Sequence, residues 1–288
     1  MSGERYFSNR SLTRHLSPAE LPDMRIQATR EKWSAPSKGR RAGWGIHGSS
    51  ISEYGRTFQS VNNSARLRVF LHERAKKKGY TSIIDLMATE SVVGEAASLG
   101  YDKGVAVSLG FPHDPKWDQK LGPGVIHTIN GNIASVECWT QIRGKQVEIA
   151  STGFDVVISR PEGGLNPDYI PSDPILYYLM LQNMWQITAL GGVMLFQVPY
   201  RLAEVSHEYF KQLIGSGIDV KLPPLSNKPN TSNPFRVRGF FGFPVRIEKA
   251  INAPTRLPRP ESEQKIRPDL RPYLNLVGIG KVPRSDLL

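Results

Sequence analysis

The chain has little cysteine and no long hydrophobic run. Cys138 is the only cysteine among 288 residues, so no disulfide forms within the chain, and a cysteine-based zinc site is disfavoured. No apolar stretch reaches the ~18 residues that a membrane-spanning helix needs. The six histidines include no pair at the spacing of metal ligands. We therefore expect no membrane association, no metal, and an intracellular, reducing compartment, either the cytoplasm or an organelle matrix.

Acidic residues are scarce in two basic segments. The net charge is +11; residues 1–50 hold nine Lys and Arg against four Asp and Glu, and residues 66–78 hold six against one. Residues 79–250 are nearly neutral. Basic segments on a neutral core favour a polyanionic partner, nucleic acid above all, although a solvated surface explains the charge too. The candidate nucleic-acid contacts are Lys38, Arg40, Arg41, Arg66, Arg68, Lys76, Lys77 and Lys78.

Sustained periodicity is absent from both ends of the chain. Residues 1–60 are rich in Pro, Gly, Ser and basic residues, and predict a basic N-terminal arm. Residues 251–288 predict a Pro-rich basic C-terminal arm. Residues 61–250 form the expected folded domain. RNA is the partner that these arms favour, and other proteins of a large assembly are a further expectation.

Within residues 61–250, strand and helix signals alternate. This order predicts an α/β fold with a mostly parallel seven-stranded Rossmann-like sheet, helices on both faces, and a C-terminal antiparallel hairpin. The expected helices cover 62–78, 90–99, 173–190 and 203–215, and the expected strands cover 81–86, 104–109, 125–129, 154–159, 191–198, 218–222 and 237–248.

Two strands end in polar segments, where parallel sheets bind ligands. One runs into Asp85-Leu-Met-Ala-Thr-Glu-Ser91, and another into Ser159-Arg-Pro-Glu-Gly163. With these segments in place, the order of elements over roughly residues 61–250 resembles that of the class I S-adenosylmethionine-dependent methyltransferases. The resemblance implies S-adenosylmethionine as the cofactor.

The resemblance also implies which residues meet this cofactor. In the family, a Gly-rich loop follows the first strand, and an Asp or Glu ends the second to bind the ribose hydroxyls. Here Met87, Thr89 and Ser91 replace the glycines, and the second strand offers only Ser108 or Leu109. The implied cofactor contacts are Asp85, Met87, Ala88, Thr89, Glu90, Ser108, Leu109, Asn132, Ile133 and Ser159.

The methyl acceptor should lie at the end of the fourth strand. Family members that methylate amino groups carry Asp/Asn-Pro-Pro-Tyr/Trp there, whereas this chain has Arg160, Pro161 and Glu162. The 2′-O-ribose enzymes use a Lys-Asp-Lys-Glu tetrad, whose aspartate falls on Arg160, whose second lysine falls near Gln197, and whose glutamate matches Glu248. The candidate catalytic residues are therefore Arg160, Glu162 and Glu248.

Three interpretations stay open. The first is an S-adenosylmethionine-dependent methyltransferase that acts on RNA through an unusual site. The second is a catalytically inactive methyltransferase-like subunit, a pseudoenzyme, that binds RNA or assembles a ribonucleoprotein or viral particle. The third is a different α/β enzyme, such as a nucleotide-binding one, although no Gly-x-x-x-x-Gly-Lys-Ser/Thr phosphate loop is present.

Overall fold

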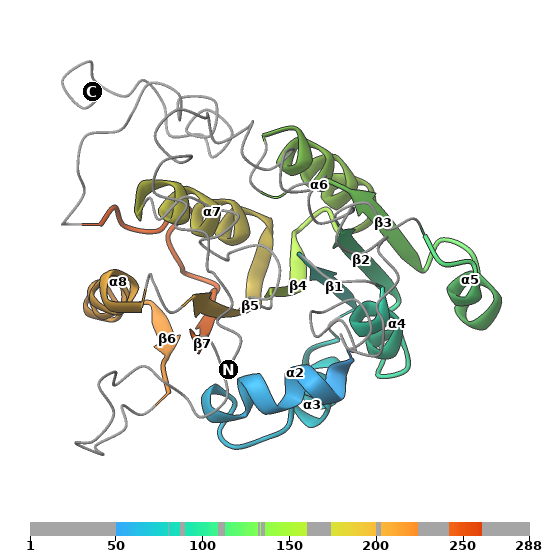
Figure 1. The fold of residues 1–288 in the computed structure, drawn as a ribbon, viewed down its shortest axis with the longest axis horizontal. Coiled ribbons are helices and arrows are strands. Elements are labelled where there is room, and N and C mark those ends of the chain that lie inside the picture. The colour runs from blue at the N-terminus through green and yellow to red at the C-terminus, as the bar shows by residue number, and fades with distance from the viewer. Residues whose placement is uncertain are drawn as a thin grey trace, which may run out of the picture.

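One seven-stranded sheet organises the molecule. The computed structural model describes residues 50–79, 81–86, 90–108, 113–131, 133, 136–159, 174–199, 203–223 and 242–260. The strands are β1 (Ser82–Asp85), β2 (Lys103–Ser108), β3 (Ile126–Asn130), β4 (Phe154–Ser159), β5 (Thr188–Pro199), β6 (Asp219–Lys221) and β7 (Gly242–Glu248). Their order is β3-β2-β1-β4-β5-β7-β6 (Figure 1). β1 to β5 run parallel, and β7 runs antiparallel to β5 and β6, which confirms the predicted fold class.

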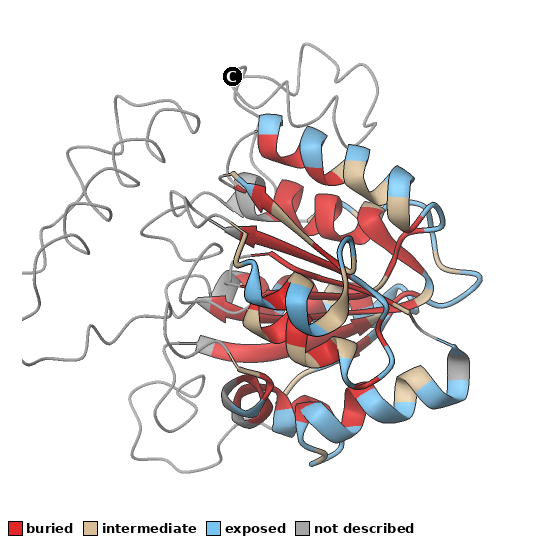
Figure 2. Cartoon of the chain, turned by 90° about the vertical axis from the view of Figure 1, so that its right-hand side faces the viewer, coloured by how far each residue is buried: buried red, intermediate tan, exposed pale blue. Residues whose placement is uncertain are grey.

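The central strands are buried on both faces. Ile83, Val156 and Leu195 point into one core, and their neighbours in the chain point into the other. This follows from the two-residue period of a strand, which sends successive side chains to opposite faces. Continuous β-branched and aliphatic runs are typical of such strands. Figure 2 shows the buried strands between helices that expose only their outer sides.

Helices cover both faces of the sheet (Figure 1). One core holds side chains of α2 to α5, and the other holds side chains of α6 to α8. The helices are α2 (Ile51–Phe58), α3 (Leu67–Lys78), α4 (Ser91–Ala97), α5 (Lys116–Leu121), α6 (Val136–Ile149), α7 (Pro174–Ile187) and α8 (Ala203–Gly215), with a 3₁₀ turn η1 at Gln59–Val61.

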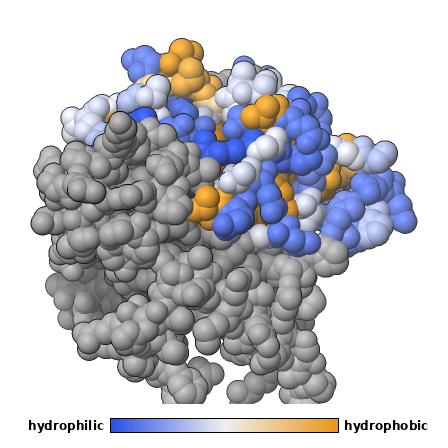
Figure 3. Space-filling view, turned by 90° about the horizontal axis from the view of Figure 1, so that it is seen from above, coloured by the Kyte–Doolittle hydropathy of each residue, from blue (hydrophilic) through white to orange (hydrophobic). Residues whose placement is uncertain are grey.

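On the face in Figure 3, the described surface is mainly hydrophilic, with hydrophobic residues scattered over it. No helix in the described ranges has the length and hydrophobicity needed to cross a membrane.

The N-terminal boundary differs from the prediction. Residues 51–60, expected in an arm, form α2 and the start of η1. Ile51, Tyr54 and Phe58 recur at helical spacing and are at most 2% exposed. This helix is part of the core because its apolar stripe packs on α3 and α4. The expected arm over residues 1–49 lies outside the described residues.

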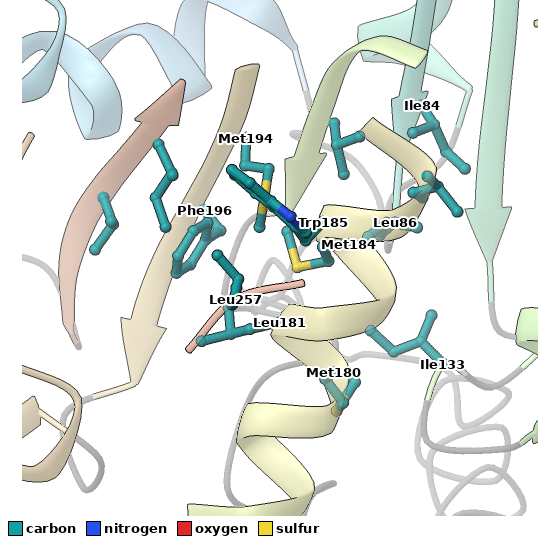
Figure 4. Close-up of a cluster of buried hydrophobic side chains, with 14 of the residues drawn as sticks. Ile84, Leu86, Ile133, Met180, Leu181, Met184, Trp185, Met194, Phe196 and Leu257 are labelled. Carbon is teal, nitrogen blue, oxygen red and sulfur yellow. The ribbon is translucent and has the colours of Figure 1, made fainter. Parts of the chain in front are cut away.

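The C-terminal boundary differs too. Residues 251–260, expected in an arm, pass over α7 and α8, and Leu257 is only 2% exposed beside Leu181 and Phe196 (Figure 4). Gln182 binds both the N–H and the carbonyl of Leu257, at 3.3 and 2.7 Å. Trp185 Nε1 donates to the Pro254 carbonyl at 2.9 Å. These bonds to the main chain fix an extended segment without regular structure, so the domain reaches residue 260. Residues 261–288 lie outside the described residues.

Candidate functional site

Two polar residues lie buried at the carboxyl ends of the central strands. Asp85 ends β1, is 0% exposed, and pairs with Ala106 of β2 and Ile158 of β4. Ser159 ends β4 and is 1% exposed, and its Oγ has no hydrogen-bond partner among the described residues. A buried hydroxyl without a partner is uncommon and marks a place where a ligand group can bind. The resemblance had implied cofactor contacts at both residues.

Glu90, five residues after Asp85 in the chain, is the centre of a hydrogen-bonded cluster. It lies immediately before α4 and is 5% exposed. Oε1 of Glu90 accepts a hydrogen bond from Thr128 Oγ1 of β3 and lies 2.5 Å from His113 Nδ1. Oε2 of Glu90 accepts from the main-chain N–H of Asp114 at 2.9 Å. The carboxylate thus joins α4, β3 and the segment that follows β2.

His113 extends this cluster to α5. Its second ring nitrogen, Nε2, lies 2.8 Å from Asp118 Oδ2. The hydrogen bond to Glu90, and then the one to Asp118, raises the pKa of His113 above its usual range, because both carboxylates favour the protonated ring. In its protonated form the ring is a cation held between two carboxylates.

Gly94 serves packing rather than ligand binding. It is the next glycine after Asp85, and it lies inside α4. A Cβ at this position would lie 2.5 Å from ring atoms of Trp117. The close approach of α5 to α4 therefore requires a glycine here.

Glu248 lies at the opposite end of the sheet, so the prediction that it is catalytic beside Ser159 is wrong. β7 begins at Gly242, beside Pro199 at the carboxyl end of β5, and runs antiparallel until Glu248 pairs with Val193. Six residues of strand span ~20 Å. At that amino end Glu248 forms ion pairs with Arg74 at 3.0 Å and Arg246 at 3.3 Å.

The side chain of Ile133 belongs to the core, and the cofactor contact implied at this residue stays a prediction. It is 1% exposed and lies in the apolar cluster with Leu86 and Met180 (Figure 4). Its carbonyl accepts a 2.7 Å hydrogen bond from Trp139 Nε1, which fixes the start of α6.

Several predicted site residues are outside the described part of the chain. For Ser108 only the main chain is described, and it pairs with Asn130 in the β2–β3 ladder. The predicted residues outside the described ranges are Met87, Ala88, Thr89, Leu109, Asn132, Arg160 and Glu162.

The basic helix predicted after residue 62 is α3. Arg66 precedes it, and Arg66, Arg68, Lys76 and Lys77 are exposed. Gly79, in the left-handed conformation with φ of +60°, ends the helix as predicted. Arg74 faces inward and pairs with Glu248. The side chain of Lys78 and all of Lys38, Arg40 and Arg41 fall outside the described residues.

Sequence reasoning missed His113, Asp118 and Thr128. Their contacts to Glu90 and to each other join segments 5 to 38 residues apart, and no periodic pattern signals them. Among the described residues, no group of three or more His, Cys, Asp and Glu side chains has the arrangement of a metal site.

The sequence matches no protein-family model, and no curated protein is significantly similar to it. Solved structures do match. MycE methyltransferase from the mycinamycin biosynthetic pathway, in complex with Mg, SAH and mycinamycin VI, is 14% identical, with coverage of 71% of this chain and 49% of that chain and a TM-score of 0.35. This chain thus spans about half of the length of that protein.

Two further solved structures are matched over nearly their whole length. Magnesium protoporphyrin IX methyltransferase from Synechocystis PCC 6803, with bound SAM, is 10% identical over 86% of this chain and 100% of that one, with a TM-score of 0.43. An rRNA methylase from Streptococcus thermophilus is 14% identical over 64% and 93%, with a TM-score of 0.37.

The architecture is defined by the strand order β3-β2-β1-β4-β5-β7-β6 and by β7, which runs antiparallel to β5. This is a methyltransferase-like Rossmann fold. Activity is a separate matter, because one fold hosts many functions and the chemistry resides in the residues of the site.

Proposed function

We propose that this protein is an S-adenosylmethionine-dependent methyltransferase that acts on RNA. The observation that carries the proposal is the placement of two buried polar residues, Asp85 and Ser159, at the carboxyl ends of β1 and β4 in a methyltransferase-like sheet, with the carboxylate of Glu90 at the start of the helix that follows β1. Ligands of open α/β sheets bind at this end of the strands. An intracellular, reducing compartment fits an RNA substrate and a chain with one cysteine.

The residues present fit this cofactor. Its ribose hydroxyls need a carboxylate acceptor, which the end of β2 lacks and which Glu90 supplies from the start of α4. The unpartnered Oγ of Ser159 is available to a ligand at the end of β4. When bound, S-adenosylmethionine supplies an electrophilic methyl group. Asp85 and Glu90 would orient the cofactor.

Binding of S-adenosylhomocysteine tests the proposal. We expect isothermal titration calorimetry of the full chain to give a dissociation constant in the micromolar range, about −8 kcal/mol of binding free energy. Adenosine, which lacks the amino-acid portion of the cofactor, serves as the control ligand and should bind more weakly. No binding at millimolar concentration would contradict the methyltransferase proposal and favour a non-catalytic subunit.

RNA as the substrate is supported by the exposed cations of α3. Arg68, Lys76 and Lys77 lie on the outer side of the helix, away from the core that Leu67 and Leu71 enter. Cations that contact phosphates release counterions, so each contact steepens the dependence of affinity on salt concentration.

Replacing Lys76 and Lys77 with alanine should weaken RNA binding and flatten its salt dependence. Removing two phosphate contacts lowers the slope of log K against log salt by about 1.4 for single-stranded RNA. Fluorescence anisotropy with a labelled RNA oligonucleotide, at several salt concentrations, measures this slope. The matched control removes Lys211 and Lys221, exposed cations of α8 and β6 that pair with Glu208 and Asp219. Equal slopes for the wild type and the Lys76/Lys77 variant would exclude α3 from the RNA contact.

A further inference from the structure

We propose that His113 is a positioning residue, which holds the Glu90 carboxylate against Thr128 of β3 so that Glu90 accepts a hydroxyl of the cofactor's ribose. The inference rests on the proposed function. Nothing in the sequence pattern pointed to His113, and its role follows from the contacts that its ring makes on both sides.

Glu90 contacts a strand to which it does not belong. Its partner Thr128 of β3 lies opposite Ala106 of β2, which in turn lies opposite Asp85 at the end of β1. The sequence places no acid at the end of β2 itself. A carboxylate offers about four acceptor positions. Thr128, His113 and the N–H of Asp114 occupy three of them, so about one remains on Oε2 for a ligand hydroxyl.

The burial of Glu90 explains why it needs a fixed partner. A carboxylate that is only 5% exposed has lost most of its water, and hydrogen-bond donors of the protein must replace it. His113 gives it a cation at 2.5 Å, and Asp118 on α5 holds the far side of the ring at 2.8 Å. The imidazole ring is thereby fixed from α4 and α5 at once.

The protonated ring is the form that makes both contacts. Each ring nitrogen faces a carboxylate oxygen, and only the imidazolium has an N–H on both nitrogens. The other charged groups around the ring are Asp114, which pairs with Lys116 at 2.5 Å, and His127 of β3. Since the pKa of His113 is raised, one of the two contacts is lost only when the pH rises through that raised value.

The test compares S-adenosylhomocysteine affinity of the wild type and His113→Gln between pH 6.0 and 8.5. Glutamine donates to Glu90 without a charge, so we expect about a tenfold loss of affinity at pH 6.0. Wild-type affinity should fall severalfold as the pH rises and His113 loses its proton. The variant has no His113 to titrate, so it should lack this fall in affinity. Titration of the ligand itself is common to both proteins and cancels in the ratio of their affinities.

The matched control is Asp219→Asn. The side chain of Asp219 pairs with Lys221 on β6, at the opposite edge of the sheet from β3, so this variant should keep the wild-type affinity and pH profile. NMR titration of the His113 ring is the second readout. Its pKa should return toward the ordinary histidine range in Glu90→Gln, and thermal unfolding shows that each variant is folded.

The outcomes separate the two proposals. Wild-type binding together with an unchanged affinity and pH profile in His113→Gln would overturn the role of His113 and leave the methyltransferase proposal intact. Absence of binding by the wild type would overturn both. A ring pKa that does not respond to Glu90→Gln would also overturn the positioning role, whatever the affinities are.

Discussion

Replacing Gly153 with alanine is expected to lower the free energy of unfolding by about 3–5 kcal/mol. Gly153 precedes β4 with φ of +103°, a conformation that L residues with a Cβ rarely adopt. An added Cβ would lie 2.6 Å from the main-chain N of Ala189 and 2.8 Å from its Cα. These atoms belong to β5, so they cannot move aside without disturbing the pairing of β4 and β5.

Substitutions at two other glycines distinguish the cost of a steric clash from the cost of placing alanine at a positive φ. Gly217 also has a positive φ, +81°, but a Cβ added there would have no atom within 4 Å, so Gly217→Ala should cost only about 1–2 kcal/mol. Gly215 ends α8 with open space around it, and Gly215→Ala should be neutral or slightly stabilising. Urea unfolding at neutral pH measures all three. If the free energy of unfolding fell equally in Gly153→Ala and Gly217→Ala, β5 would have shifted to accommodate the new methyl group.

The strands of the parallel sheet could be predicted because burial on both faces leaves a strong signal. β4 has the predicted bounds, and β1 to β3 differ from theirs by one residue at each end. Runs such as Phe154–Ser159 consist almost entirely of residues that favour buried strands, and polar or turn-forming residues end them.

The helices without a broad apolar stripe were missed. α6 buries only Cys138, Trp139 and Ile142, and α5 buries only Trp117. α2 has eight residues, so its stripe covers barely two turns and was hidden in a segment rich in Gly and Ser. Short helices depend on tertiary packing rather than on local pattern, and a single sequence does not display that packing.

The site could be predicted in part. Asp85 and Ser159 were located because strand ends are visible in the sequence. The partners of Glu90 were not, since His113 and Thr128 lie 23 and 38 residues away. The error at Glu248 arose from its position along β7: an antiparallel strand carries its last residue away from the edge where the parallel strands end.

Lys249 gives the second large expected effect, a rise in stability at alkaline pH. It follows β7, is 8% exposed, and donates from Nζ to the carbonyls of Trp185 and Thr188 at 2.7 Å each. Burial lowers the pKa of Lys249 to about 8 from 10.5, because the charged amine loses its hydration. Between these two values the unfolded chain binds more protons than the folded one. The free energy of unfolding should therefore rise with pH in this window, by up to about 3 kcal/mol.

Urea unfolding of the wild type and Lys249→Met, from pH 7 to 10.5, isolates this contribution. Methionine keeps an apolar side chain of similar length but cannot titrate, so the variant should lack the rise. Tyr178 has a raised pKa and lowers stability at high pH, but it does so in both proteins. If the free energy of unfolding changed with pH in the same way in the wild type and in Lys249→Met, Lys249 would stay charged in the folded state. The direction of the effect follows from the hydrogen bonds: a neutral amine still donates to the Trp185 and Thr188 carbonyls, so losing the proton removes the cost of a buried charge while the bonds at the end of α7 remain.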